Sequence, residues 1–405
     1  MATYDFLRGV RVVEVAHLGP SSLGGLLADM GAEVIKIESS RGDPIRDSGS
    51  PAVGSTEGPS LLHFRWNRGK QSVGLDLKSN AGQELLKALV QQCDIVIEGM
   101  RAGILDELGL GYETLSALRP GLVFCSISGL GRTGPYHTLG SAGPSFDAFG
   151  GLTMPRSTSP STPGDLPTPP LIGMYAAGLY AAIGVISALF KARSTGTGAS
   201  IEVAGAEASA HWKADGVDVA LNPASMFERP GFKDELGRQA YWPRLCAYKT
   251  RDDKMFFFQA YADKFWQRFC VVMNRDDLRD IYQQSRPLTE IEEDVFRELQ
   301  NLFRTRTLSE LIELCVKNDI PGGPANTSDD LATDPHFLAR NNLYNAKLPN
   351  GEELRLTSTP IKVEGQAFTP SLPPDLGEHT NEILGRLLGK GAVEIEALRN
   401  KGTAY

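Results

Sequence analysis

Residues 10–38 read V-R-V-V-E-V-A-H-L-G-P-S-S-L-G-G-L-L-A-D-M-G-A-E-V-I-K-I-E. The first seven residues are rich in β-branched side chains, which favour a strand. A break at residues 17–20 precedes a helix that we expect to begin with Ser21 or Ser22 as its cap, and a second strand follows over residues 33–38. A helix between two strands makes them parallel, so this stretch predicts a Rossmann-like sheet.

The same alternation continues through the first half of the chain. Further helices are expected over residues 79–92, 112–118 and 175–192, and further strands over 94–98, 122–128 and 199–203. After about residue 225 the pattern changes to that of a smaller α+β domain. There we expect two strands within 245–259, helices over 262–272, 289–303 and 309–317, a turn at 320–324, and later helices over 328–334, 379–388 and near 393–401.

These patterns divide the chain into a large and a small domain. The predicted order is the large Rossmann-like domain (1–200), a linker (201–225), the small α+β domain (226–320), a second linker (321–365) and C-terminal helices that return to the large domain (366–405). The intervening Pro/Ser/Thr-rich stretch at 155–170 is expected to be a loop.

Composition excludes several classes of function. The chain has 405 residues and a net charge of -8, which argues against nucleic acid and anionic membranes as partners. The N-terminus has no secretory pattern, and the apolar run at 176–190 is too short to span a bilayer comfortably.

Five scattered cysteines without a C-x-x-C pair indicate neither zinc nor disulfides, so we expect a cytoplasmic protein. The first strand is not followed by G-x-G-x-x-G, which argues against an NAD enzyme.

Four blocks of sequence resemble class III CoA-transferases, the family that includes formyl-CoA transferase, carnitine CoA-transferase and α-methylacyl-CoA racemase. The blocks follow each other in family-like order and cover nearly the whole chain. They are L-R-G-V-R-V-V-E-V to R-G-D-P-I-R (7–46), N-R-G-K-Q-S-V-G-L-D-L with D-I-V-I-E-G-M-R-A-G-I-L-D-E-L-G-L-G-Y-E (67–113), S-I-S-G-L-G-R-T-G-P-Y (126–136), and D-I-P-G-G-P-A-N-T-S-D-D-L-A-T-D-P-H-F with L-G-E-H-T-N-E-I-L (319–384).

The resemblance implies a fold and a kind of reaction. In the family, the first half of the chain and its C-terminal tail build the Rossmann-like domain, and two chains pass through each other as interlocked rings. A CoA thioester is the substrate, and no cofactor or metal is implied. One carboxylate attacks the thioester and carries the acyl group, which splits one difficult transfer into easier steps.

The residue that carries this chemistry in the family is missing here. The family aspartate stands four residues before the glycine that corresponds to Gly178, and this chain has Met174 at that place. A thioether is neither ionised nor an acyl acceptor. Two other acids lie nearby: Asp165 in the Pro-rich loop, which we interpret as a solvated turn residue, and Asp147, which we interpret as an acid at a helix start.

The racemase branch of the family is disfavoured. It needs a histidine that would fall near residues 143–145, where none occurs. His137 lies six residues earlier and is expected to cap a turn. The chain therefore lacks both residues of the racemase pair.

The resemblance also implies a set of CoA contacts. These positions are His17, Leu18, Lys70, Gly99, Met100 and Arg101. Two departures weaken the expected site, because Ser39 and Glu107 stand where relatives often have arginine. A lost cation and a gained anion beside a charged ligand reduce binding.

The sequence thus predicts a subunit of a heteromeric CoA-transferase with no catalytic residue of its own. Its partner would be a homologous chain that bears the aspartate. The resemblance points to succinyl-CoA as donor and benzylsuccinate as acceptor, a reaction of anaerobic toluene degradation. The alternatives are a self-sufficient enzyme that uses Asp165 and a non-enzymatic CoA-binding relative.

Overall fold

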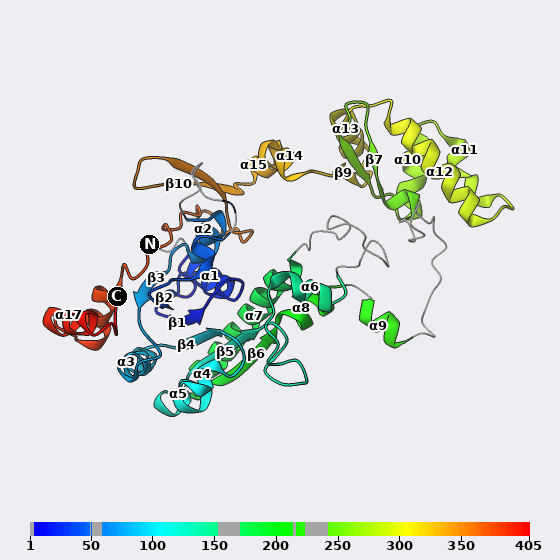
Figure 1. Ribbon diagram of the computed structural model, residues 1–405. Helices are drawn as coiled ribbons and strands as arrows, with labels where there is room; N and C mark the ends of the chain where they lie inside the picture. Colours follow the sequence, from blue (N-terminus) through cyan, green and yellow to red (C-terminus); the bar gives the residue numbers. More distant parts are fainter. Residues whose placement is uncertain (1–3, 49, 51–58, 153–170, 214–215, 223–241) are drawn as a thin grey trace, which may run out of the picture. The chain divides into compact units, whose positions relative to one another are not determined.

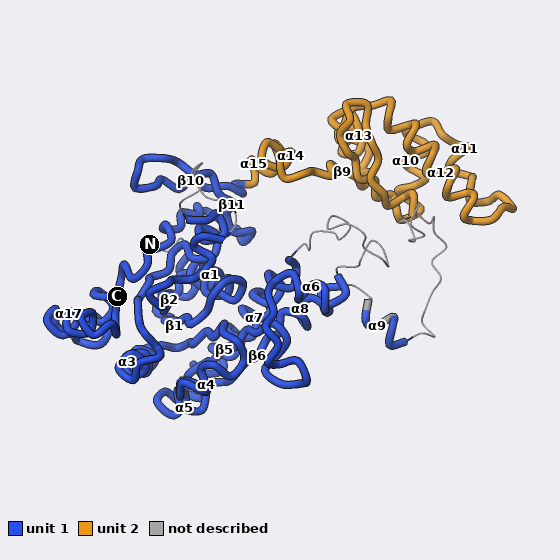
Figure 2. Tube along the Cα trace, in the orientation of Figure 1, with its two compact units in different colours: residues 1–223, 341–405 blue, residues 224–340 orange. Residues whose placement is uncertain are grey.

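The computed structural model describes residues 4–48, 50, 59–152, 171–213, 216–222 and 242–405. It divides into two compact units, which Figure 2 colours separately. Unit 1 comprises Met1–Pro223 and Asn341–Tyr405, and unit 2 comprises Ala224–Arg340.

A six-stranded parallel sheet forms the centre of unit 1 (Figure 1). Its strands are β1 (Arg11–Ala16), β2 (Glu33–Glu38), β3 (Gln71–Gly74), β4 (Ile95–Gly99), β5 (Val123–Ser128) and β6 (Ala199–Ala204). They lie in the order β3-β2-β1-β4-β5-β6, and every neighbouring pair is parallel. The direction of winding therefore reverses between β1 and β4, and ligands of open α/β sheets bind beyond the strand ends at such a point. The predicted Rossmann-like fold is confirmed.

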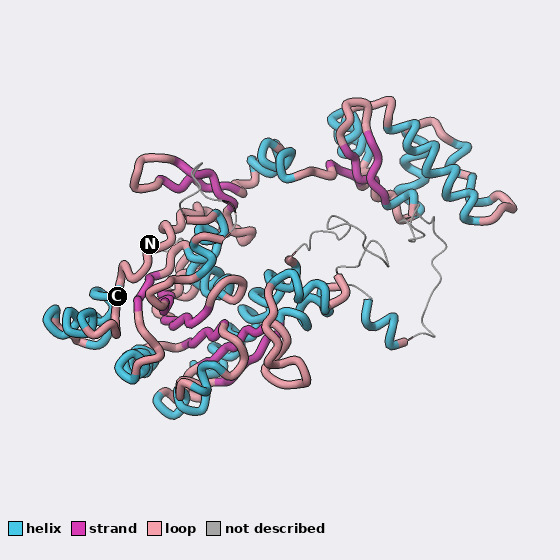
Figure 3. Tube along the Cα trace, in the orientation of Figure 1, coloured by secondary structure: helices cyan, strands magenta, loops and turns pink. Residues whose placement is uncertain are grey.

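Helices cover both faces of this sheet, as Figure 3 shows. Alternate strand residues point to opposite faces, so Val12 packs with helices α1 (Ser21–Asp29) and α7 (Ile172–Thr195). Its neighbour Val13 packs on the other side. That side is covered by α3 (Asn80–Gln91), α5 (Tyr112–Leu118), α16 (Thr380–Leu388) and α17 (Ala392–Asn400). The strands read as continuous apolar runs because both faces are buried.

The long helix α7 is longer than the sequence indicated. By length and composition alone it is long and apolar enough to cross a membrane, because it has 24 residues and an 18-residue stretch within it has a mean hydropathy of 1.8. Half of that stretch is buried in the protein. Its small residues allow close packing: a Cβ added at Gly178 would lie 2.4 Å from the hydroxyl oxygen of Ser22 in α1. The helix thus extends beyond the apolar run at 176–190, and its inner face belongs to the core.

Two segments expected to be linkers hold regular structure within unit 1. The 201–225 stretch contains the end of β6, helix α8 (Gly205–Trp212) and helix α9 (Gly216–Leu221). The 321–365 stretch contains the hairpin of β10 (Leu343–Lys347) and β11 (Glu353–Thr357). Remaining elements of unit 1 are the 3-10 helix Pro44–Arg46, α2 (Leu61–Asn67), α4 (Ile104–Glu107) and α6 (Gly143–Phe149).

Unit 2 has its own aromatic core around a three-stranded antiparallel sheet. The strands are β7 (Cys246–Lys249), β8 (Met255–Phe258) and β9 (Gly322–Pro324). Residues 320–324 were expected to be a turn, but β9 pairs with β8 there because Gly322 fits against the ring of Phe256. The other elements are Pro243–Leu245, α10 (Asp263–Val272), α11 (Asp276–Arg279), Ile281–Gln283, α12 (Leu288–Phe303), α13 (Leu308–Asn318), α14 (Ser328–Thr333) and α15 (Pro335–Ala339).

Close packing of α1 against α2 gives a first prediction. A Cβ at Gly25 would lie 2.6 Å from the backbone oxygen of Trp66, so Gly25→Ala must push the two helices apart. We expect the free energy of unfolding to fall by about 1–3 kcal/mol, measured by urea denaturation. Gly385→Ala in α16 is the control, because its new methyl group would meet the nearest atom at 3.6 Å. Equal stability of the two variants would contradict the prediction.

Candidate functional site

A cavity of about 450 Å³ opens beyond the carboxyl ends of the central strands of unit 1. Three loops that follow β1, β4 and β5 form its floor. They contribute residues His17, Leu18, Gly19 and Pro20; Gly99, Met100, Arg101 and Ala102; and Ile127, Ser128, Gly129 and Leu130. The cavity therefore lies where the winding of the sheet reverses, which is the expected position for a ligand.

Helices and one loop complete the walls. They supply Ile45, Leu62, Trp66, the 137–144 segment, Phe146, Leu171, Met174 and Ala177. Most of these side chains are apolar, so the walls suit the apolar part of a ligand. Phe146 adds an aromatic ring to the lining.

Met174 lies in the first turn of α7 and faces this cavity. Its side chain is 9% exposed and fits between two glycines. A Cβ added at Gly19 would lie 2.4 Å from its Cγ, and one added at Gly143 would lie 3.1 Å from its Sδ. The thioether thus fills the space between the loop after β1 and the start of α6.

No aspartate or glutamate occurs among the cavity-lining residues of the described chain. Asp147 is fully buried outside the cavity, where it accepts hydrogen bonds from the backbone amides of Ile172 (3.0 Å) and Gly173 (2.7 Å). Ser209 donates a further hydrogen bond to it. Its carboxylate caps the first amides of α7 from α6, in which Asp147 is the fifth of seven residues, so it is not itself at a helix start. Asp165 lies outside the described residues.

Three titratable side chains face the cavity: His17, Arg101 and His137. Burial and the charge of Lys36 lower the pKa of His17, so this imidazole is neutral at pH 7. His137 is exposed and donates from Nδ1 to the carbonyl of Gly134 at 2.8 Å, the tautomer being assigned from that acceptor. It caps a turn as predicted. Arg101 therefore gives the cavity its permanent positive charge.

Lys70 is placed differently from the sequence expectation. It is absent from the cavity lining, and its side chain is fully buried. Its ammonium donates to both carboxylate oxygens of Glu14 (2.9 and 2.7 Å), to the carbonyl of Ser21 and to Asn67. All its donors are used within the protein, so Lys70 holds the start of α1 rather than a ligand. Burial lowers its pKa to about 8 despite the neighbouring carboxylate.

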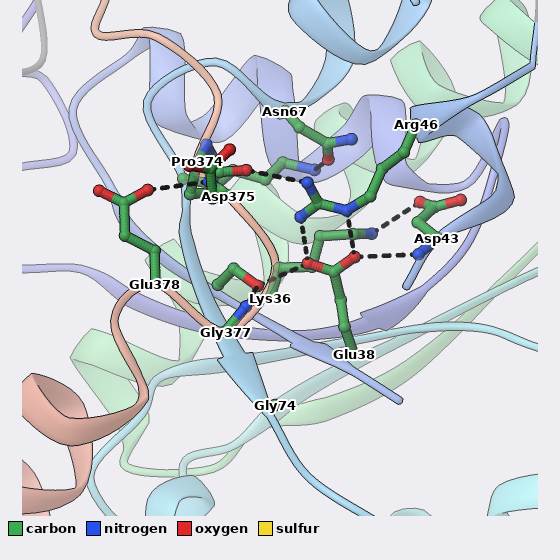
Figure 4. A network of polar contacts seen from close by, with 12 residues as sticks. Lys36, Glu38, Asp43, Arg46, Asn67, Gly74, Pro374, Asp375, Gly377 and Glu378 are labelled. Atoms are coloured by element: carbon green, nitrogen blue, oxygen red, sulfur yellow. Dashed lines mark hydrogen bonds and ion pairs between the residues drawn. The ribbon is translucent and has the colours of Figure 1, made fainter. Parts of the chain in front are cut away.

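A buried charge cluster lies behind the cavity floor, and Figure 4 shows much of it. Glu38 accepts two hydrogen bonds from Arg46 (2.9 and 2.6 Å) and one from the backbone amide of Asp43 (2.9 Å). Lys36 pairs with Asp43 at 2.9 Å and with Glu14 at 2.9 Å. Burial alone would raise the pKa of Glu38 and of Asp43. The surrounding cations and hydrogen-bond donors outweigh this effect and lower both pKa values to about 2.

The structure brings most of the predicted contacts together and leaves others aside. His17, Leu18, Gly99, Met100 and Arg101 all line the cavity. Ser39 and Glu107 are exposed and do not. Sequence reasoning missed the cavity residues of α2 and the role of Asp43. The D-P pair at 43–44 was the available signal, because an aspartate before proline often starts a tight turn.

Comparison with known proteins agrees with this geometry. The family model for CoA-transferase family III matches residues 7–380. The chain belongs to this family. A solved structure of a CaiB/BaiF family protein from Brucella suis aligns with a TM-score of 0.74 and 27% identity, over 95% of this chain and 100% of that one.

Several curated relatives of this family III protein match it over almost their whole length. The alpha subunit of succinyl-CoA–L-malate CoA-transferase from Chloroflexus aurantiacus is 31% identical over 98% of this chain and 92% of its own. The beta subunit of that enzyme is 30% identical, with 98% and 97% covered. Cinnamoyl-CoA:phenyllactate CoA-transferase from Clostridium sporogenes is 31% identical, with 97% and 96% covered.

The buried cluster gives a prediction for acid. The folded pKa values of Glu38 and Asp43 (about 2) lie below their ordinary 4.5 and 3.8, and burial lowers that of His63 to about 4 from 6.5. As the pH falls, the unfolded chain therefore binds protons at these groups before the folded chain does. Their contribution to the free energy of unfolding is full above about pH 6.5 and is lost towards pH 2. Each carboxyl accounts for roughly 2–3 kcal/mol.

Urea unfolding of the protein between pH 7 and pH 3 measures this loss. Glu38→Gln should flatten the dependence below pH 5, whereas Glu382→Gln on an exposed surface should not change it. An unfolding free energy that stays constant from pH 6 to pH 3 would show that the cluster does not set acid stability.

Proposed function

We propose that this chain is the subunit without the nucleophile in a heteromeric class III CoA-transferase. The observation that carries the proposal is a well-formed cavity with Met174 at the first turn of α7 and no carboxylate among the described residues that line it. In the family reaction, a carboxylate oxygen bonds to the acyl carbon while the C–S bond breaks and CoA leaves as the thiolate. A thioether sulfur carries no charge and forms no such acyl intermediate.

The partner would be a homologous chain that bears the aspartate, joined to this one as interlocked rings in the cytoplasm. The match to both an alpha and a beta subunit of one Chloroflexus enzyme supports such a pairing of related chains. An exposed stripe on α7 supports it as well. Leu179, Ile183, Ile186 and Phe190 are 44%, 65%, 43% and 80% exposed, and their spacing places them on one helix face.

For the substrates, we infer succinyl-CoA as donor and an aromatic dicarboxylate such as benzylsuccinate as acceptor. Two relatives are named for succinyl-CoA, and a third for cinnamoyl-CoA and phenyllactate. The cavity walls support an aryl group through Trp66 and Phe146, and Arg101 suits a carboxylate. The enzyme that this pattern resembles is succinyl-CoA:(R)-benzylsuccinate CoA-transferase of anaerobic toluene degradation.

A self-sufficient transferase that uses Asp165 is the alternative. This residue precedes the cavity residue Leu171 by six positions, so the chain itself keeps it close in sequence to the site. The purified chain would then transfer CoA without a second polypeptide, and Asp165→Ala would abolish that activity. A non-enzymatic relative would bind acyl-CoA without transferring it under any condition.

Restoring the carboxylate tests the main proposal. Met174→Asp replaces the thioether by a shorter side chain in the space between Gly19 and Gly143, in the first turn of a helix, where a negative charge is favoured. We expect incubation with succinyl-CoA followed by hydroxylamine to leave a hydroxamate at position 174, detected by peptide mass spectrometry.

The controls are the native chain and Met174→Ala, both of which should stay unlabelled. With the partner present, label should appear on the partner and not on the native chain. Labelling of the native chain at another acid, or transfer by the native chain alone at an ordinary enzymatic rate, would refute the proposal.

The α7 stripe gives a second prediction about the partner. The double substitution Ile183→Glu and Phe190→Glu places two charges on the exposed apolar face without touching the buried one. We expect loss of co-purification with the partner, measured by size-exclusion chromatography of co-expressed chains. Val393→Glu, at an 84% exposed site on α17, is the matched control. If the double variant still co-purified with the partner, or if the native chain were recovered from the membrane fraction, the stripe would not be the surface that binds the partner.

A further inference from the structure

One wall of the cavity is held in a backbone conformation that its residue seldom adopts. Leu18, in the loop after β1, has a φ of 55°, in the left-handed region. Its side chain is 39% exposed and lines the cavity. A branched L-residue in this region persists only where surrounding structure enforces it, and such residues gather at functional sites.

Asp43 provides this enforcement. Its Oδ1 accepts hydrogen bonds from the backbone amides of Leu18 (3.1 Å) and Ile45 (3.0 Å). Both of these residues line the cavity, whereas Asp43 does not. One buried carboxylate therefore fastens two wall segments that come from the ends of different strands.

Lys36 fixes the carboxylate in turn. Its ammonium lies 2.9 Å from Oδ2 of Asp43 and donates to the carbonyl of Ala16 (2.6 Å) and to the hydroxyl of Ser21 (2.9 Å). Ala16 and Ser21 stand immediately on either side of residues 17–20. The turn is thus held at both ends and, through Asp43, in its middle (Figure 4 shows Lys36 and Asp43).

We propose that Asp43, oriented by Lys36, is a positioning residue that sets the place of Leu18 and Ile45 and so decides which acyl groups the cavity accepts. The inference rests on the proposed function, in which this cavity holds the acyl part of a CoA thioester. Asp43 acts through Leu18 and Ile45 and touches no ligand. Relaxation of Leu18 out of the left-handed region would move its side chain relative to Trp66 and Met174 on the other walls.

The experiment removes the carboxylate and measures the turn directly. In Asp43→Ala, amide hydrogen exchange should become at least tenfold faster in peptides that cover residues 17–22 and 44–46 and remain unchanged in β4 and β5. The ratio of Kd values for succinyl-CoA and cinnamoyl-CoA, measured by calorimetry on the complex with its partner, should shift severalfold. Adding Leu18→Gly should restore protection at the turn, because glycine adopts this φ without strain.

Two further variants keep the test decisive. Loss of one member of a buried ion pair can unfold a protein, so Asp43→Glu retains the charge while moving the carboxylate, and it should show the same two effects. Asp29→Glu is the control, since this acid forms a buried pair with Arg68 at 2.6 Å and does not line the cavity. It should leave exchange at residues 17–22 unchanged.

The outcomes separate the two proposals. Protection that is unchanged at the turn, or lost evenly across the sheet, would overturn the positioning role. Faster exchange confined to the turn with an unchanged Kd ratio would overturn its control of specificity. If the native complex binds neither CoA ester, the proposed function fails, and the claim about acyl choice fails with it.

Discussion

Lys36 carries a positive charge with no exposed surface, and the site of unit 1 depends on how that charge is neutralised. Its ammonium pairs with Glu14 and Asp43. Beside it, Lys70 shares Glu14, and Arg46 pairs with Glu38. Three cations thus face three anions, so the cluster is neutral. Removing one member would leave the buried cluster with a net charge, which costs more than the lost pair itself contributes.

The cluster lies where the sheet topology makes it useful. Its members come from β1, from β2 and the segment after it, and from the residue before β3, and Asp43 contacts the loop at residues 17–20 through the amide of Leu18. Parallel strands place all their carboxyl ends at one edge, so loops from β1, β4 and β5 meet there in any fold of this order. The topology decides where a cavity forms. The charges decide which conformation the first loop takes, because they bind its backbone at Ala16 and Leu18.

Local pattern was sufficient for the strands of the central sheet, which read as continuous apolar runs, and for the helices that carry an apolar stripe. β3, α2 and the β10–β11 hairpin were missed, since their short sequences carry mixed patterns and their pairing depends on distant residues. The site shows the same division. Loop residues that follow a strand, such as His17 and Arg101, were found from the resemblance. The burial of Lys70 was not, because a lysine beside a loop looks alike in sequence whether its partner is a phosphate or Glu14.

Under the proposed function, the separation of structural charge from reactive charge explains how the chain keeps its cavity without the nucleophile. The side chain at position 174 packs between two glycines at the cavity wall, and the first amides of α7 are already capped by Asp147. A carboxylate at position 174 would therefore satisfy no buried donor that the fold requires, and methionine replaces it without leaving an orphaned group. The cations of the cluster are neutralised elsewhere. Under the proposed function, the reactive group is therefore separate from the buried network that shapes the cavity.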